Sequence, residues 1–367
     1  MQDLRSISSR FAIQGRFEDA QPHGHGHIHD TYLVTCRDGE RPIRTILQRI
    51  NHDVFTDPPR LMDNLLRVTG HLRRRLQAEG VSDLPRRVLT VVQTRDGAWC
   101  HRDPDGHHWR ALEFIPDTVT VETPQSVDPI YQAARAFGRF DALLSDLPGP
   151  PLQETIPGFH NGVGRYRALE AAVGKDACNR AALASREIAF VQGHADILEA
   201  PSRLAGQGRI PIRVTHNDTK INNVLLDRAT GEGLCVIDLD TVMPGLALYD
   251  VGDLIRTACS TASEDEPDLA KVELRPDRFE AVVRGFLTGA GTSLHPSEIE
   301  RLVLGGQFMT LIIGARFLTD FLQGDTYFKV HRPNHNLDRC RVQFRLAQTL
   351  IEQQDRLQQI VRREAGS

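Results

Sequence analysis

Two stretches of the chain decide its fold: Thr-His-Asn-Asp-Thr-Lys-Ile-Asn-Asn at 215–223 and Val-Ile-Asp-Leu-Asp at 236–240. The first contains the pattern His-x-Asp-x-x-x-x-Asn, and the second ends an apolar run with acidic residues. Phosphoryl transfer to a hydroxyl needs a carboxylate that orients the attacking group and oxygen ligands that hold magnesium on the phosphates. This spacing supplies both. We expect Asp218 to be the catalytic base, Asn223 and Asp238 to bind Mg2+, and ATP to be the phosphoryl donor.

A hairpin is expected between the two stretches, because the apolar runs 224–226 and 234–237 flank a turn-forming segment. This hairpin would bring Asn223 and Asp238 together. Lys220, two residues after the expected base, is a second catalytic candidate and is predicted to reach the γ-phosphate. The alternative interpretation is a polar loop in which Asp and Asn are present because they favour turns.

Two further acidic residues lie near this loop. Asp240 is expected to support the metal site or contact the substrate, and an acidic turn residue is the alternative. Asp250 is expected to brace the catalytic loop, and a carboxylate that favours the helix dipole is the alternative.

The composition is that of a folded protein, with 367 residues of which 40% are hydrophobic and 25% are charged. The formal charge of -4 offers no general attraction to nucleic acid or to an anionic membrane, so we expect small-molecule partners only. The six cysteines form no Cys-x-x-Cys pair and are interpreted as buried free thiols. The sequence shows no signal-peptide pattern and no run approaching 18 apolar residues, which favours a cytoplasmic enzyme; we expect a monomer.

The pattern along the chain predicts an α+β protein with two domains, 1–116 and 117–367, joined by the Pro- and Thr-containing connector 116–128. In the first domain a helix is expected between Pro59 and Gly80. The strands expected there are His27–Cys36, Arg44–Ile50, Arg87–Thr94, Ala98–His101 and His108–Ile115. The helices expected in the second domain are Pro129–Leu144, Arg165–Val173, Ala181–Leu198, Asp277–Leu287, Pro296–Leu322 and Asn336–Val361.

Several segments of the C-terminal half are characteristic of one group of proteins. They are Thr-Ile-Pro-Gly-Phe-His-Asn at 155–161, the stretch 215–223, Val-Ile-Asp-Leu-Asp-Thr-Val-Met-Pro-Gly at 236–245, Tyr-Asp-Val-Gly-Asp at 249–253, Ala-Arg-Phe-Leu-Thr-Asp at 315–320 and Asn-Leu-Asp-Arg at 336–339. With them the chain resembles the aminoglycoside phosphotransferase and choline kinase superfamily, and more closely the N-acetylhexosamine 1-kinases.

The resemblance implies a bilobal protein kinase-like fold, with ATP between a small antiparallel-sheet lobe and a larger helical lobe. It implies transfer of the γ-phosphoryl group to the anomeric hydroxyl of N-acetylglucosamine or N-acetylgalactosamine, without deciding between them. The sugar contacts that it implies, beside Asp218, are His27, Thr257, Arg316 and Tyr327. For Arg316 an ion pair with Asp320, four residues on, is the alternative.

Nucleotide-binding residues are expected in the first lobe. Gly24 and Gly26 take the place of the loop that covers the nucleotide, where a missing side chain lets backbone N–H groups approach phosphate. The histidines at 23, 25, 27 and 29 alternate, so a transition-metal site or a flexible loop is also open. Where kinases usually place a lysine, on the third strand, this chain offers Gln48 or Arg49 on opposite faces, and we favour Gln48.

Two other functions stay open at this stage. The same fold would serve another small hydroxyl acceptor, such as a different hexose, an aminoglycoside or an amino alcohol. The missing lysine, and a following helix with acidic residues only near its ends at Asp63 and Glu79, also allow a non-catalytic nucleotide-binding pseudokinase. The intact catalytic motif argues against the pseudokinase.

Overall fold

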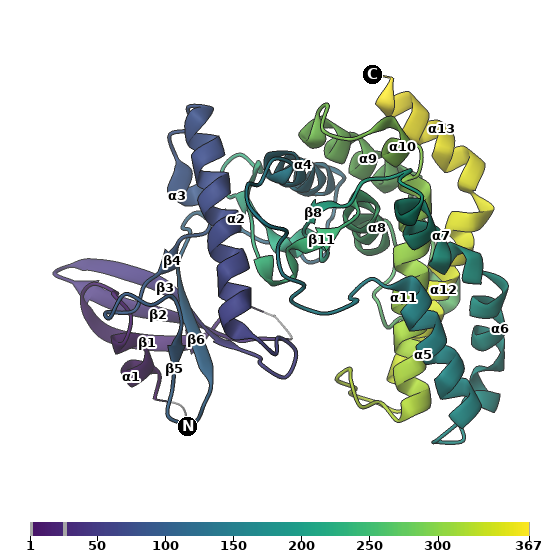
Figure 1. Cartoon of the computed structure of the whole chain (residues 1–367), viewed down its shortest axis with the longest axis horizontal. Coiled ribbons are helices and arrows are strands. Elements are labelled where there is room, and N and C mark those ends of the chain that lie inside the picture. The colour runs from purple at the N-terminus through teal and green to yellow at the C-terminus, as the bar shows by residue number, and fades with distance from the viewer. Residues whose placement is uncertain (1–2, 25–27, 367) are drawn as a thin grey trace.

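The computed structural model describes residues 3–24 and 28–366 and shows a bilobal α+β fold (Figure 1). The N-terminal lobe is built on an antiparallel sheet with strand order β1-β2-β3-β6-β4, and β5 pairs with β6. Its strands are β1 (Arg16–Pro22), β2 (Asp30–Asp38), β3 (Arg41–Ile50), β4 (Val91–Val92), β5 (His101–Arg102) and β6 (His108–Glu113). Its helices are α1 (Leu4–Ser9), α2 (Pro58–Ala78) and α3 (Leu84–Arg87).

The structure confirms the predicted β2–β3 hairpin but adds one strand and shortens another. Val34 and Leu47 are fully buried in a small core on the sheet, together with Trp109. Strand β1 was not predicted. It is an edge strand with mostly exposed side chains, so its sequence shows no alternation of apolar and polar residues. The predicted strand 87–94 is wrong at its start, where the chain is helical, and only Val91–Val92 pairs with β6.

Helix α2 forms where the apolar spacing predicts it and links the two lobes. Asp57 caps it by accepting a hydrogen bond from the Arg60 N–H, and Gly80 follows its end with a φ of +76°. Its apolar face, from Leu61 to Leu76, packs into the same core as the helices of the C-terminal lobe. The hydrophobic core is therefore continuous from one lobe to the other.

The C-terminal lobe is mainly helical (Figure 1). Its helices are α4 (Asp128–Leu144), α5 (Gly162–Lys175), η1 (Ala181–Ala184), α6 (Ser185–Gly193), α7 (Ala195–Gly206), η2 (Ile221–Asn223), η3 (Leu239–Thr241), α8 (Ala247–Ala258), η4 (Leu269–Lys271), α9 (Pro276–Ala290), α10 (Pro296–Ile299), α11 (Leu302–Gln323), α12 (His335–Glu352) and α13 (Gln354–Ala365). Three predicted long helices are each divided: the first at 184–185 and 193–195, the second at 299–302 and the third at 352–354. Apolar periodicity continues across these breaks, which is why the sequence did not reveal them.

Short strands support the catalytic loop. They are β7 (Thr118–Val119), β8 (Arg213–Thr215), β9 (Val224–Asp227), β10 (Gly233–Val236) and β11 (Met243–Gly245). The predicted hairpin is confirmed as β9–β10, and β7 pairs with the free side of β9. Because β6 belongs to the N-terminal sheet and β7 to this one, we keep a division of the chain near residue 116 as our proposal.

Helix α11 is the one helix of the described residues that is long and apolar enough to cross a membrane. Its most apolar 18-residue window is 78% buried inside the protein, with α5, α8 and α12 packed around it. The apolar composition of α11 is thus that of a central core helix.

All six cysteines are free, but not all are buried. Cys36, Cys235, Cys259 and Cys340 are buried as predicted. Cys178 is exposed and Cys100 is half-buried, so the prediction of a buried thiol is wrong for these two.

Helices α8 and α11 approach each other closely through facing glycines, and this contact positions both sides of the site described below. A Cβ atom on Gly252 of α8 would lie 2.2 Å from the carbonyl oxygen of Gly305 of α11. A Cβ atom on Gly305 would lie 2.5 Å from the carbonyl oxygen of Leu248. The two backbones can touch only because neither residue has a side chain.

We predict that Gly252→Ala lowers the free energy of unfolding by about 1–3 kcal/mol, because the added methyl group has to push α8 away from α11. Gly174→Ala in α5 is the matched control, since its Cβ would meet nothing within 4 Å. That variant should leave stability unchanged or raise it by up to about 1 kcal/mol. Urea unfolding of both variants is the measurement, and equal stability of the two would contradict the close helix contact.

Candidate active site

The catalytic loop after β8 is held from behind by Asp250 of α8. The Asp250 carboxylate accepts hydrogen bonds of 2.7 Å from the backbone N–H groups of both His216 and Asn217, and its backbone oxygen accepts one from the Thr219 hydroxyl. Asn217 has a φ of +66°, a conformation that turns the chain sharply before Asp218. The predicted brace is therefore present in the structure.

A second carboxyl group lies behind the brace. Burial and the charge of Asp250 raise the pKa of Asp141 well above its usual value, and burial raises the pKa of Asp250 to about 6. The two carboxyl groups thus influence each other's ionisation. Asp250 acts as a hydrogen-bond acceptor for the loop.

Asp218, the expected base, lies beside Lys220. The Lys220 Nζ atom is 3.0 and 3.1 Å from the two carboxylate oxygens of Asp218. Burial alone would raise the pKa of Asp218, but the Lys220 ammonium outweighs it and the pKa is lowered. Asp218 is therefore ionised at neutral pH and can accept a hydrogen bond from an incoming hydroxyl.

The two expected magnesium ligands flank the β9–β10 hairpin. The amide nitrogen of Asn223 donates to the backbone oxygen of Asp218, at 2.9 Å, which leaves its amide oxygen as the ligand atom. Asp238 follows β10 in a left-handed conformation, with a φ of +59°. Desolvation by the surrounding chain and the charges of Asp240 and Asp218 raise the pKa of Asp238 to about 6. The residue as a whole is exposed at the surface. An amide oxygen and a carboxylate that lacks a cationic partner fit magnesium, which prefers oxygen ligands.

Asp240 lies in a buried network between the two lobes, and its predicted support of the metal site remains a prediction. Its carboxylate accepts two hydrogen bonds of 2.5 Å from the guanidinium of Arg110 on β6 and one of 2.8 Å from His29 Nε2. Asp240 and Arg110 are buried, so this is an ion pair between the two lobes. Burial opposes ionisation, yet Arg110 and His29 hold the pKa of Asp240 well below its usual range. Sequence reasoning missed Arg110, because nothing local links it to a residue 130 positions away.

The position of the usual strand lysine belongs to the same network. The Gln48 side-chain oxygen accepts a hydrogen bond of 2.9 Å from Arg110 Nε, and its amide nitrogen donates to the Thr31 hydroxyl. Arg49 points elsewhere and forms an ion pair with Asp30. Gln48 thus faces the junction between the lobes and supports Arg110, and its predicted contact with the nucleotide remains a prediction.

Helix α2 is fixed to the C-terminal lobe without a glutamate. Asn64, which is buried, donates to the backbone oxygens of Gln153 and Val242 and accepts a hydrogen bond from the Gln153 N–H. Glu79 at the end of the helix pairs with Arg139. The lysine–glutamate pair that is typical of protein kinases is absent from the described residues. Asn64 and Arg110 are two of the residues that make buried contacts between the lobes.

The glycine-rich segment lies between β1 and β2, as expected for a loop over the nucleotide. Gly24 has a φ of +76°, and a Cβ atom there would meet nothing within 4 Å. Gly26, His25 and His27 lie outside the described residues, so their predicted roles remain predictions. Both ring nitrogens of His29 are occupied, by Asp240 and by the Asn51 N–H, which excludes His29 as a metal ligand in this arrangement.

Arg316 lies among aromatic rings near the catalytic loop. Its guanidinium is 5.4, 5.8 and 5.5 Å from the ring centroids of Phe159, Tyr327 and Phe328. The alternative of an ion pair with Asp320 is wrong. The buried Asp320 carboxylate instead accepts hydrogen bonds from the backbone N–H groups of residues 326–328, and so holds Tyr327 beside Arg316.

Thr257 lies on α8 one turn after Asp253. Its hydroxyl donates to the Asp253 backbone oxygen at 2.8 Å, so its predicted contact with the acceptor would involve the remaining lone pairs or the methyl group. Asp253 itself forms an ion pair with Arg256, with 2.7 Å between Oδ1 and Nε.

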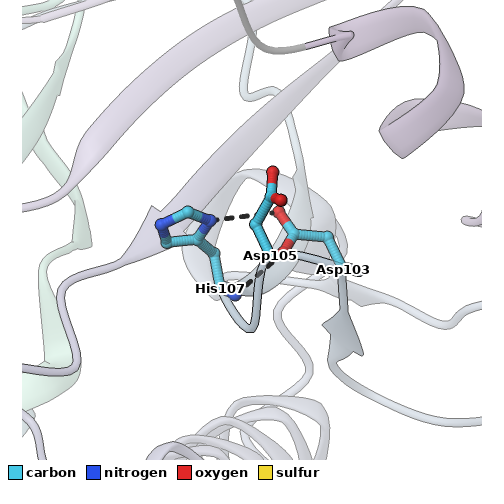
Figure 2. Close-up of side chains that lie close together, drawn as sticks. All are labelled: Asp103, Asp105 and His107. Atoms are coloured by element: carbon cyan, nitrogen blue, oxygen red, sulfur yellow. Dashed lines mark hydrogen bonds and ion pairs between the residues drawn. The ribbon is translucent and has the colours of Figure 1, made fainter.

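A separate cluster of metal-ligand residue types occurs in the turn between β5 and β6. Figure 2 shows Asp103, Asp105 and His107, whose ligand atoms lie within 4.8 Å of one another. The Asp103 carboxylate already accepts hydrogen bonds of 2.8 Å from the His107 N–H and from Trp109 Nε1. These bonds account for the cluster as a polar turn that is anchored to a buried tryptophan.

The geometry of this site agrees with a match over most of the chain. The profile of the phosphotransferase enzyme family matches residues 19–283, which include the glycine-rich segment and the whole catalytic loop. The chain belongs to this family. The expected superfamily of aminoglycoside phosphotransferases and choline kinases is thereby confirmed.

Solved structures show the same fold as this phosphotransferase. An aminoglycoside phosphotransferase from Alicyclobacillus acidocaldarius is 14% identical, with a TM-score of 0.57 over 97% of this chain and 96% of that chain. A choline kinase from Cryptosporidium parvum is 13% identical, with a TM-score of 0.57 over 96% of each chain. A spectinomycin phosphotransferase, solved with ADP and spectinomycin, is 12% identical, with a TM-score of 0.51 over 93% of this chain and 98% of that chain.

We predict that Arg110→Ala lowers the free energy of unfolding by about 3–5 kcal/mol, because the Asp240 carboxylate stays buried without its guanidinium partner. Arg275→Ala is the control. It breaks an exposed ion pair with Asp277, which should cost about 0–1 kcal/mol.

The pH dependence of this contribution follows from the lowered pKa of Asp240. The stabilisation is fully present above about pH 4, the ordinary pKa of an unfolded Asp, and is lost as the pH falls from there toward the lowered pKa of the folded state.

Urea unfolding of both variants at pH 7 measures the loss of free energy of unfolding. A loss for Arg110→Ala no larger than that for Arg275→Ala would show that the ion pair does not hold the lobes.

Proposed function

We propose that this phosphotransferase is an ATP- and magnesium-dependent sugar kinase that phosphorylates the anomeric hydroxyl of N-acetylhexosamines. The observation that carries the catalytic part is the ionised Asp218, held by the braced loop between Lys220 and Asn223. The solved relatives named above act on small molecules that carry hydroxyl groups, according to their names, and this supports a small hydroxyl acceptor. A cytoplasmic location and a monomeric state complete the proposal.

The chemistry divides among the residues of the loop. Asp218 accepts a hydrogen bond from the attacking hydroxyl and orients it. It takes the hydroxyl proton as the new P–O bond forms and the bond between the γ-phosphorus and the leaving ADP oxygen breaks. Lys220 favours the ionised form of Asp218. We expect its ammonium to reach the transferred phosphoryl group as well. Asn223 and Asp238 would hold magnesium, which neutralises charge on the phosphates. Phosphoryl transfer depends mainly on the positions of the reacting groups and on the stabilisation of charge. The hydrogen bonds from the loop to Asp250 therefore contribute to catalysis by fixing the position of Asp218.

The environment of Arg316 favours a sugar over a polycation. Arg316 has no carboxylate partner among the described residues, and burial together with Arg165 lowers its pKa. Two guanidiniums near the acceptor position repel aminoglycosides. The guanidinium N–H groups can instead donate hydrogen bonds to the carbonyl oxygen of an acetamido group.

We predict that ADP release from Mg-ATP depends on an N-acetylhexosamine, and that phosphorus NMR of the product shows an anomeric phosphate. The acceptor panel is N-acetylglucosamine, N-acetylgalactosamine, N-acetylmannosamine, glucose, galactose, kanamycin and choline. Asp218→Asn should lower kcat by roughly 100- to 10,000-fold, since the base that orients the hydroxyl is lost.

Asp196→Asn, an exposed carboxylate on α7, is the matched control and should leave kcat unchanged. Turnover on kanamycin or choline alone would replace the acceptor in this proposal. ATP binding without transfer to any acceptor would favour the pseudokinase instead.

A further inference from the structure

Two buried polar side chains beside the catalytic loop each have one atom without a hydrogen-bond partner among the described residues. They are His160, in the segment before α5, and Asp253, on α8. Their exposed fractions are 7% and 2%, and the free atoms are His160 Nδ1 and Asp253 Oδ2. A buried polar atom without a partner destabilises the folded chain, so a pair of them at one site requires an explanation.

The hydrogen-bonding role of His160 Nδ1 follows from the other ring nitrogen. His160 Nε2 lies 2.8 Å from the backbone oxygen of Asn217, which can only accept, so Nε2 carries the hydrogen. Burial lowers the pKa of His160 to about 4, so the ring is neutral at pH 7. A neutral ring with its hydrogen on Nε2 has a lone pair on Nδ1. This nitrogen is therefore an acceptor, and its ring is tied to the residue that precedes Asp218.

Asp253 offers a second acceptor. Its Oδ1 atom receives the hydrogen bond from Arg256 Nε, which leaves Oδ2 with free lone pairs. The charge of Asp253 acts on both His160 and Lys220, which places the carboxylate near the Asp218–Lys220 pair. The same turn of α8 carries Asp250, which braces the loop, so the position of Asp253 relative to Asp218 is fixed by the helix.

We propose that His160 Nδ1 and Asp253 Oδ2 form a subsite for the molecule that is phosphorylated. The two atoms accept hydrogen bonds from two groups of that molecule other than the hydroxyl that receives the phosphoryl group. Both atoms are closed off from solvent, so the proposal includes a movement of the side chains that cover them when the acceptor binds. Arg316, 5.4 Å from the ring centroid of Phe159, the residue before His160, adds a donor. The subsite is thus matched to a molecule that carries several hydroxyl groups.

This inference rests on the proposed kinase activity but narrows the acceptor by its own chemistry. Choline carries one hydroxyl and no other donor, so it would leave both acceptor atoms unpaired. An aminoglycoside has donors but would meet the charges of Arg165 and Arg316. A neutral, polyhydroxylated acceptor satisfies both conditions.

A cycle of variants and deoxygenated acceptors tests the subsite. The acceptors are the preferred sugar of the wild type and its 3-, 4- and 6-deoxy analogues, and the measured quantity is kcat/KM. For the wild type we expect at least one deoxy analogue to lose about 10-fold or more. In Asp253→Ala that same deoxygenation should cost less than about 2-fold, because its partner is already gone. His160→Phe, which keeps the ring packing on Phe159 and Tyr249, should remove the penalty at a second hydroxyl.

The controls separate this subsite from a general loss of structure. Glu264→Ala removes the other carboxylate of Arg256, 3.0 Å away, without touching either free atom, and should keep every wild-type deoxy penalty. If Asp253→Ala does not fold, His160→Phe carries the test alone. Equal deoxy penalties in the wild type and in the folded variants would overturn the subsite.

The outcome for the acceptor panel is distinct from the outcome for the subsite. Wild-type turnover on a different hexose would end the hexosamine proposal, while the same deoxy cycle on that hexose would still decide the subsite. Turnover of choline as efficient as that of the sugars would overturn the subsite directly.

Discussion

Carboxylates gathered at the junction of the two lobes are the constraint on which the rest of the structure depends. Each needs its own compensation, because an uncompensated buried charge is costly. Asp240 is paired with Arg110 and His29, and Asp250 accepts hydrogen bonds from two backbone N–H groups. Asp253 is paired with Arg256, and Asp218 is paired with Lys220. Asp238 is the member without a cationic partner among the described residues, and it is the member that opens to solvent. The arrangement leaves the one position where a divalent cation would complete the balance of charge.

The network around Arg110 shows how this fold aligns its lobes without the lysine–glutamate pair of protein kinases. A guanidinium from β6 reaches across to Asp240, two residues after the metal-ligand candidate Asp238. Gln48 then serves as an acceptor that orients the guanidinium. Asn64 performs the second task of holding α2 against the C-terminal lobe. These buried contacts join the two lobes through the protein's own side chains.

At the proposed binding site for the phosphoryl acceptor, hydrogen-bond pairing is the main constraint. Around the loop the chain presents acceptors at His160 and Asp253 and a donor at Arg316, with aromatic rings on one side. Hydrogen bonds of this kind discriminate by the cost of leaving a buried atom unpaired, which is greater than the gain from making the bond. The glycine contact between α8 and α11 matters here because it holds Asp253 and Arg316 on adjacent helices.

The sequence alone determined the catalytic loop, because its residues lie directly before and after one hairpin and local spacing decides which of them meet. It also determined α2 and the β2–β3 hairpin, where apolar periodicity matches the secondary structure that forms. Tertiary structure alone decided the partner of Asp240 and the role of Asp320. The partner of a buried charge is set by which groups the fold brings next to it, and these can lie at any distance along the chain. It also decided the edge strand β1, whose exposed side chains leave no pattern. The free atoms of His160 and Asp253 belong to this second group, because an unpaired atom is recognised only when every possible neighbour is in place.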